Sequence, residues 1–156
     1  MGKALFYHLT RHPVEVTLTT LVGKALEQGW QVLVRGRDAE RMDWLDQKLW
    51  QTGGDEGFLP HGLAGGPHDS DQPILLTTAP DNTNNAVYLV SIDGAEITRD
   101  EVQKAERGVI LFDGHDAAAL AHARTQWKTL TDAGCPAEYW SEETGRWEKK
   151  AEKIVD

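Results

Sequence analysis

Short runs of apolar residues alternate along this chain with longer segments in which apolar residues recur at helical spacing. The short runs have the length of buried strands and lie at residues 5–9, 32–34, 74–76, 87–92 and 109–112. Helices are predicted after Pro13, after Asp38, and at 100–107 and 117–133. This alternation predicts an α/β protein with a Rossmann-like three-layer fold, in which helices cover both faces of a mostly parallel, twisted sheet.

Two regions lack this clear pattern. Residues 53–73 form a long, glycine-rich connection, and loops of this length within a compact domain are often functional. Residues 137–147 predict a last strand with a turn near Gly145, and residues 149–156 form a charged tail that we expect to fray. Residues 1–148 are then predicted to be a single domain, because two domains would each fall near the lower end of the usual size range.

Charge and cysteine content limit the partners and the compartment. The formal net charge is −9, whereas nucleic-acid binders carry a basic patch because phosphate neutralisation drives their binding. We therefore expect no strong direct binding to DNA, and any basic site must be small and local. No apolar run approaches the ~20 residues that span a bilayer, so no membrane association is expected. Cys135 is the single cysteine, which together with the absence of a signal-peptide pattern predicts a cytoplasmic protein.

The motifs that would support catalysis are missing. The turn from Thr10 to Pro13 after the first strand contains no glycine, and its proline removes an N–H that a bound phosphate would need. The glycine-rich run at 62–67 lacks the lysine and hydroxyl residue of a phosphate-binding loop. No histidine shows zinc-ligand spacing, and Cys135 follows a helix C-terminus, where the helix dipole disfavours a thiolate. We expect no enzymatic activity, no cofactor and no metal.

One turn keeps a rival hypothesis open. It consists of Asp113, Gly114, His115 and Asp116, which follow a predicted strand at its carboxyl end. Open α/β sheets bind ligands at that end of their strands, so the chain would then be a small α/β enzyme or ligand-binding protein. The interpretation that we favour is a strand-to-helix turn with an acidic N-cap.

Two cations and an aromatic residue share one side of the late helix. Arg124 and Lys128 are four residues apart and therefore lie on one helix face, with Trp127 beside them. Such a group suits a chain-terminal carboxylate that follows a hydrophobic side chain. A solvated helix face above a core tryptophan is the alternative, and composition alone favours it.

Aromatic residues also gather around the second helix. Trp44 and Trp50 lie on it or just beyond its end, and Trp50 and Phe58 bracket the start of the long connection. Exposed aromatic clusters tend to be protein-contact sites, because aromatic side chains supply much of the binding energy of interfaces. The sequence leaves a core role and an interface role equally open here.

Several motifs occur in a fixed order over most of the chain, from about Phe6 to Trp147. They are Phe6-Tyr7, Leu49-Trp50, Phe58-Leu59-Pro60-His61 followed by Leu63-Ala64-Gly65, Arg124, Trp127-Lys128, Ala133-Gly134 and Trp147. The Phe-x-Pro-His run before Leu-Ala-Gly is the most specific piece. In the order and spacing of these motifs the chain resembles the chi subunit of bacterial DNA polymerase III.

The resemblance implies a Rossmann-like fold and a non-enzymatic role in the clamp-loader assembly of the replicase. It implies binding to the acidic C-terminal tail of the single-stranded DNA-binding protein, which ends in a phenylalanine carboxylate. It also implies a separate, aromatic-bearing surface that docks the psi subunit or, in some bacteria, a repair helicase.

The resemblance also assigns roles to individual residues. It places the tail pocket at Arg124, Trp127 and Lys128, and the second docking surface at Trp50 and Phe58. The family usually carries a tyrosine at the position of Trp127, and a lysine one helical turn earlier, where this chain has Leu120. The loss of that cation predicts a weaker or rearranged grip on the tail.

Overall fold

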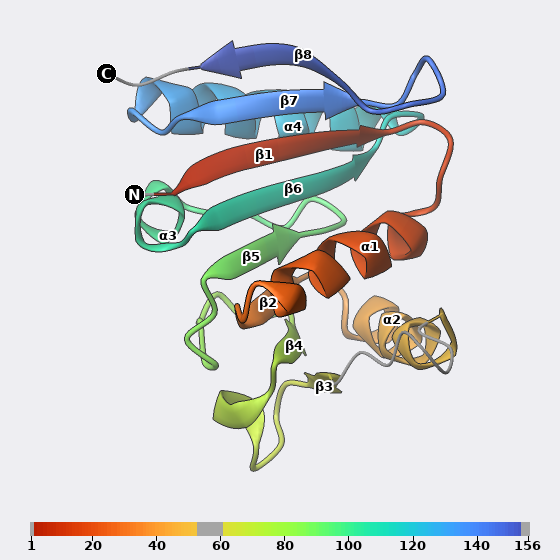
Figure 1. Ribbon diagram of the computed structural model, residues 1–156, viewed down its shortest axis with the longest axis vertical. Helices are drawn as coiled ribbons and strands as arrows, with labels where there is room; N and C mark the ends of the chain where they lie inside the picture. Colours follow the sequence, from red (N-terminus) through yellow and green to blue (C-terminus); the bar gives the residue numbers. More distant parts are fainter. Residues whose placement is uncertain (1, 53–60, 154–156) are drawn as a thin grey trace.

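The computed structural model describes residues 2–52 and 61–153, which contain an eight-stranded sheet with helices on both faces (Figure 1). In the order in which they lie across the sheet, the strands are β3 (His61–Leu63), β4 (Ile74–Thr77), β2 (Val32–Arg35), β5 (Tyr88–Ser91), β6 (Arg107–Asp113), β1 (Lys3–Leu9), β7 (Ala137–Ser141) and β8 (Glu148–Lys153). All neighbouring strands run parallel except β7 and β8, which are antiparallel. The predicted fold class is confirmed.

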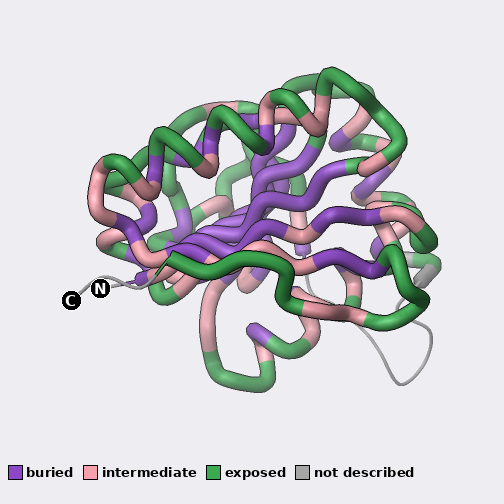
Figure 2. The backbone as a smooth tube through the Cα atoms, turned by 90° about the horizontal axis from the view of Figure 1, so that it is seen from above, coloured by how far each residue is buried: buried purple, intermediate pink, exposed green. Residues whose placement is uncertain are grey.

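The helices form two layers around this sheet. They are α1 (Val14–Glu27), α2 (Ala39–Thr52), α3 (Arg99–Lys104) and α4 (Ala117–Asp132), with a short 3-10 helix η1 (Asp69–Asp71). Buried residues of α1 and α2 pack on one face of the sheet, and those of α3 and α4 pack on the other. The central strands are buried between these layers, and the outer sides of the helices are exposed (Figure 2).

Successive residues of each central strand enter two different cores. In β6, Val109 and Leu111 belong to the core under α1 and α2, whereas Ile110 and Phe112 belong to the core under α3 and α4. Side chains alternate between the faces of a strand, and both faces of this sheet are covered. This explains why the strands appear in the sequence as unbroken apolar runs.

Polar caps and a glycine set the helix ends where the sequence predicts them. Asp38 accepts a hydrogen bond from the amide of Glu40 before α2, and Asp116 accepts from two amides in the first turn of α4. After α1, Gly29 has a φ of +80°, a left-handed conformation that glycine adopts without steric cost.

The connection at 53–73 contains more regular structure than the sequence predicts. Residues 53–60 lie outside the described part of the chain. After them, β3 adds a parallel edge strand beside β4, and η1 follows. The buried His61 lies with its Nε2 2.9 Å from the carbonyl oxygen of Asp46 on α2, which holds β3 against that helix. A three-residue strand with a glycine at its centre is too short to show a period-two pattern, so the sequence does not predict this strand.

The charged tail expected to fray from residue 149 is instead mostly a strand. Glu148–Lys153 forms β8, which pairs with β7 at the edge of the sheet, so these residues do not fray. Its ion pairs, such as Lys149 Nζ to Glu152 Oε2 at 3.0 Å, lie on an exposed strand. Charged edge strands resist pairing with other chains, which is a physical reason for the polar sequence. Residues 154–156 are outside the described part.

Cys135 is fully buried in the core under α3 and α4, and burial raises the pKa of its thiol, in agreement with the predicted core role. Among the residues that the structure describes, no helix combines the length and the apolar character needed to cross a membrane. The same residues contain no group of three or more His, Cys, Asp or Glu that could hold a metal ion.

Candidate functional site

Helix α4 places both predicted cations at the surface. The helix begins at the Asp116 cap and turns its inner side toward the sheet, with the buried residues Ala123, Gln126 and Leu130. Arg124 and Lys128 are exposed on the other side. Neither of them forms an ion pair within the described part of the chain. The sequence-predicted pair is therefore accessible to a partner.

A groove of about 880 Å³ lies beside Arg124. Its walls come from α4, from the β7–β8 edge, and from the turns that follow β1 and β6. Leu120, one turn before Arg124, also lines it, and Tyr139 contributes from β7. Among the described residues, Trp127 and Lys128 do not line this groove. Of the three residues predicted to form the tail pocket, Arg124 is therefore the one that lines this groove.

The ring of Trp127 points inward. It packs edge-on against Phe6 at a centroid distance of 5.3 Å and against Tyr139 at 6.1 Å, and it is partly buried against the core under α3 and α4. The aromatic ring exposed in the groove is that of Tyr139, which the sequence analysis did not single out. The sequence gives little sign of this role, because a tyrosine in a short strand cannot be distinguished by its pattern from a residue of the hydrophobic core.

Tyr139 is one end of a polar contact chain in the groove that has His8 at its centre. Its hydroxyl lies 3.3 Å from Nδ1 of His8, and that nitrogen lies 3.7 Å from Oε1 of Glu143. Burial raises the pKa of Tyr139, while the positive charge of Arg124 lowers it and Glu143 raises it further. The hydroxyl therefore stays protonated at neutral pH, and the charge of Arg124 acts on this part of the groove.

The groove carries more positive than negative charge. Arg11, Arg124 and Lys150 line it, against the single carboxylate of Glu143 among the described residues. The whole chain has a formal net charge of −9, so this is a local reversal of sign. A small positive site on an acidic protein suits a compact anionic ligand.

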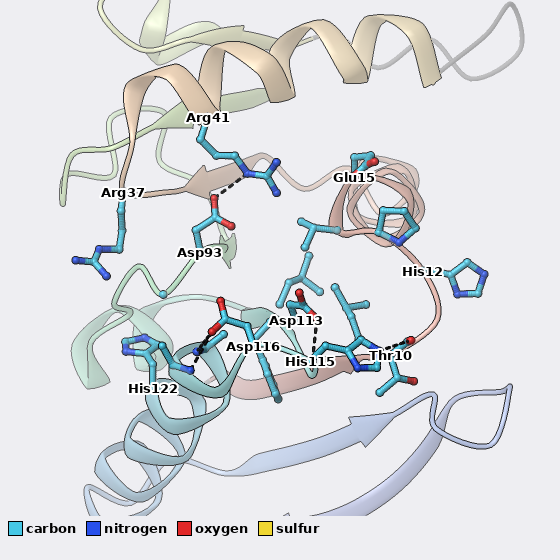
Figure 3. Close-up of a pocket in the computed structure, with 18 of the residues that line it drawn as sticks. Thr10, His12, Glu15, Arg37, Arg41, Asp93, Asp113, His115, Asp116 and His122 are labelled. Atoms are coloured by element: carbon cyan, nitrogen blue, oxygen red, sulfur yellow. Dashed lines mark hydrogen bonds and ion pairs between the residues drawn. The ribbon is translucent and has the colours of Figure 1, made fainter.

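A second hollow, of about 680 Å³, opens at the carboxyl ends of β1, β5 and β6 (Figure 3). Arg37, Arg41, Asp93 and His122 line it, and the sequence analysis named none of them. They follow β2 and β5 or lie on helices, and only the strand order brings them together. Arg41 Nε and Asp93 Oδ2 form an ion pair across this hollow at 3.0 Å.

The turn of the rival hypothesis also lines this second hollow, but its acids serve the local backbone. Asp113 Oδ1 accepts a hydrogen bond from the amide of His115 at 2.9 Å. Asp116 Oδ1 accepts from the amides of Ala118 and Ala119 as the cap of α4. These contacts match the strand-to-helix turn with an acidic N-cap that the sequence analysis favoured.

The turn after β1, where nucleotide-binding folds carry their glycines, is closed by a carboxylate of the same chain. The amides of Thr10, Arg11 and His12 all donate to Oε1 of the buried Glu142, at 3.0, 2.7 and 2.8 Å. Amides at the start of a helix are a common anion-binding position. Here that position already holds Glu142.

The second predicted docking surface is only partly described. Trp50 belongs to the last turns of α2, and Phe58 lies outside the described residues. Trp44, earlier on α2, packs partly against the core under α1 and α2, with the Arg41 guanidinium 4.4 Å from its ring centre. Lys48 Nζ lies 5.6 Å from the same ring centre. Trp44 therefore combines core packing with cation–π contacts, while the roles of Trp50 and Phe58 stay predictions.

Comparison of the sequence with known proteins shows which protein family the chain belongs to. Residues 1–138 match the family model described as DNA polymerase III chi subunit, HolC. A relative described as "Probable DNA polymerase III subunit chi", from Rickettsia prowazekii (strain Madrid E), is 28% identical over 99 residues. That match covers 64% of this chain and 59% of the relative, so the chain spans less than two thirds of the relative's length. Since the family model covers most of the chain, the resemblance is confirmed, and the chain belongs to the DNA polymerase III chi subunit family.

Proposed function

We propose that this protein is a non-catalytic accessory subunit of bacterial DNA polymerase III that binds the acidic C-terminal tail of the single-stranded DNA-binding protein. In this role it links the protein-coated single strand to the clamp-loader complex of the replicase. The observation that carries the proposal is the position of Arg124, which lines a net positive groove and has no ion-pair partner within the described residues. Membership of the chi family supports it.

The chemistry of the groove fits a terminal phenylalanine. A guanidinium pairs with a carboxylate through two parallel N–H···O bonds, so Arg124 is suited to the chain end. Leu120 and the ring of Tyr139 offer apolar surface for the phenylalanine side chain. The ring of Trp127 packs edge-on against the ring of Tyr139, with 6.1 Å between the ring centres, and so supports its position. Lys128 lies one turn beyond Arg124 on the same helix face, and we expect it to contact acidic side chains outside the groove.

Titration with an acidic peptide that ends in phenylalanine tests this proposal. Arg124→Ala should weaken binding about tenfold, because a charged hydrogen-bonded pair in an open groove is worth ~1–2 kcal/mol. Lys128→Ala should cost less, because an ammonium is a less directional partner than a guanidinium. Added salt should weaken the wild type more than Arg124→Ala, because the variant has already lost the screened attraction.

A matched control uses Lys24, an exposed cation on α1 at the other face of the sheet. Lys24→Ala removes the same charge and should bind the peptide like the wild type. If Arg124→Ala binds the peptide as tightly as Lys24→Ala does, Arg124 is not the tail-binding residue and the proposal fails at its main position.

We further propose that Trp50 and Phe58 dock a second partner, the psi subunit or a repair helicase. The supporting argument is the family resemblance together with their position at the end of α2 and just after it. Phe58→Ala should leave tail-peptide binding unchanged and weaken the second contact about tenfold or more, as for an interface hot spot. If Phe58→Ala unfolds the domain, the residue belongs to the core and this proposal is wrong.

A further inference from the structure

The pairing of β8 with β7 contains one irregular step. Tyr139 pairs with Ala151, and the next residue of β7, Trp140, pairs with Lys149. Lys150 is therefore an extra residue in β8, opposite no residue of β7. A β-bulge of this kind bends the strand and redirects a side chain, and bulges concentrate at sheet edges and beside functional sites. Here the extra residue is one that lines the groove.

The neighbouring lysine lies on the other face of the sheet. Lys149 is paired with Trp140, and residues directly opposite each other on two strands share a face. Trp140 lines a separate hollow with α1, on the face away from α4. Two consecutive lysines of β8 thus serve opposite sides of the sheet, and Lys150 is the one on the side of Arg124.

Arg11 brings a third cation to the groove from the turn after β1. Its Nε donates to the carbonyl oxygen of Glu142 at 3.2 Å, and its Nη2 donates to that of Glu143 at 3.1 Å. Both acceptors are neutral backbone groups, so these bonds fix the guanidinium without cancelling its charge. Lys150 Nζ lies 3.5 Å from Oε2 of Glu148, and this pair is exposed, so it is worth little and a bound acid can compete with it. Arg11 and Lys150 together form one wall of the groove, facing α4.

We propose that Arg11 and Lys150 form a second cationic wall that binds the acidic side chains upstream of the tail's terminal carboxylate. This inference rests on the proposed function. It explains how the groove keeps its positive charge although α4 carries Leu120 one turn before Arg124. Lys150 lies beyond residue 138, where the match to the family model ends, so this wall is not inferred from the family motif. An extended acidic segment would pass between α4 on one side and β8 on the other.

The direct test compares Lys150→Ala with Lys149→Ala in titrations with an acidic peptide that ends in phenylalanine. At an ionic strength of ~0.15 M, screening acts over about 8 Å, so a lysine on the far face has little influence. Lys150→Ala should weaken binding about two- to fivefold, as expected for an exposed ion pair, and Lys149→Ala should leave it unchanged. Arg11→Gln, which keeps a donor group and removes the charge, should act like Lys150→Ala.

A second peptide separates the two walls. In it the acidic side chains are replaced by their amides, and the terminal phenylalanine carboxylate is kept. With this peptide the effect of Lys150→Ala should disappear, whereas the effect of Arg124→Ala should remain. This crossover distinguishes a contact to upstream side chains from a general loss of positive charge.

The outcomes are distinct for the two proposals. If Arg124→Ala weakens binding but Lys150→Ala and Lys149→Ala bind equally well, the second wall is refuted and the proposed function stands. If Lys150→Ala weakens both peptides equally, Lys150 does not recognise the upstream acids and the inference is wrong. If the wild type binds neither peptide, the inference and the proposed function fall together.

Discussion

Glu142 and His12 are 130 residues apart in the sequence, yet Oε2 of Glu142 lies 2.7 Å from Nδ1 of His12. The other carboxylate oxygen accepts the three amides of the turn after β1. Burial of Glu142 raises its pKa, but the hydrogen bonds from His12 and from the amides of Arg11, His12 and Thr10 outweigh burial and lower the pKa to about 2. The carboxylate thus ties the β7–β8 turn to the start of α1.

Replacing this carboxylate by an amide should destabilise the fold. In Glu142→Gln one oxygen can still accept, but the amide nitrogen is a donor placed among donors, and the charge is lost. We expect the free energy of unfolding to fall by about 1–3 kcal/mol, measured by urea denaturation at neutral pH. Glu15→Gln, at a partly exposed acid in the first turn of α1, is the control and should change it by less than about 1 kcal/mol.

The same contact predicts a dependence of stability on pH. Because the pKa of Glu142 falls from 4.5 to about 2 on folding, its stabilisation is fully present above pH 4.5 and is lost as the pH falls toward 2. The difference in unfolding free energy between the wild type and Glu142→Gln should therefore be constant from about pH 7 to about pH 5 and shrink at lower pH. A difference that does not change with acidification would show that this carboxylate is not held as described.

Gly114 is required by close packing in the turn between β6 and α4. A Cβ at this position would overlap the ring of His8 and lie 2.9 Å from the carbonyl oxygen of Leu9. Gly114→Ala should therefore cost about 1–3 kcal/mol of unfolding free energy. Gly23 offers the opposite case, because a Cβ there meets nothing within 4 Å. Gly23→Ala on α1 should stabilise the protein by about 0.5–1 kcal/mol, and thermal melts of the two variants should shift in opposite directions.

A buried ion pair links β2 to α3. The guanidinium of Arg35 donates to both carboxylate oxygens of Glu101, at 3.0 and 2.7 Å, and also to backbone carbonyls. Arg35→Met should destabilise the fold by about 3–5 kcal/mol, because it leaves the Glu101 carboxylate without its partner. The half-exposed pair of Arg41 and Asp93 is the control, and Arg41→Met should cost less than about 1 kcal/mol. If urea denaturation shows that Arg35→Met and Arg41→Met lose the same unfolding free energy, burial does not make the pair of Arg35 and Glu101 more important for stability.

Trp127 should contribute mainly to the stability of the fold and less to direct binding of the tail peptide. Its ring packs between Phe6 and Tyr139, so Trp127→Ala should lower the unfolding free energy by about 2–4 kcal/mol, somewhat less than for a fully buried tryptophan. Trp127→Tyr keeps a ring in this place and should recover most of the loss. A fully stable Trp127→Ala variant that no longer binds the tail peptide would show that the ring acts as a direct contact.

The sequence by itself predicted the elements that its local patterns encode. Apolar runs bounded by turns gave five of the strands in their correct places, and the caps at Asp38 and Asp116 marked two helix starts. The spacing of Arg124 and Lys128 placed both on one exposed helix face. These features depend on residues within one or two turns of each other, and therefore they can be read before any tertiary contact is known.

Only the tertiary structure decided what meets in the groove and at the turn after β1. β8 has no apolar alternation, and its pairing with β7 is set by the sheet edge next to it. The bulge that turns Lys150 toward Arg124 is a property of that pairing, and the contact of Glu142 with His12 joins the two ends of the chain. Charged and polar side chains carry no periodic signal of their partners, because the partner is chosen by strand order and register rather than by the neighbouring sequence.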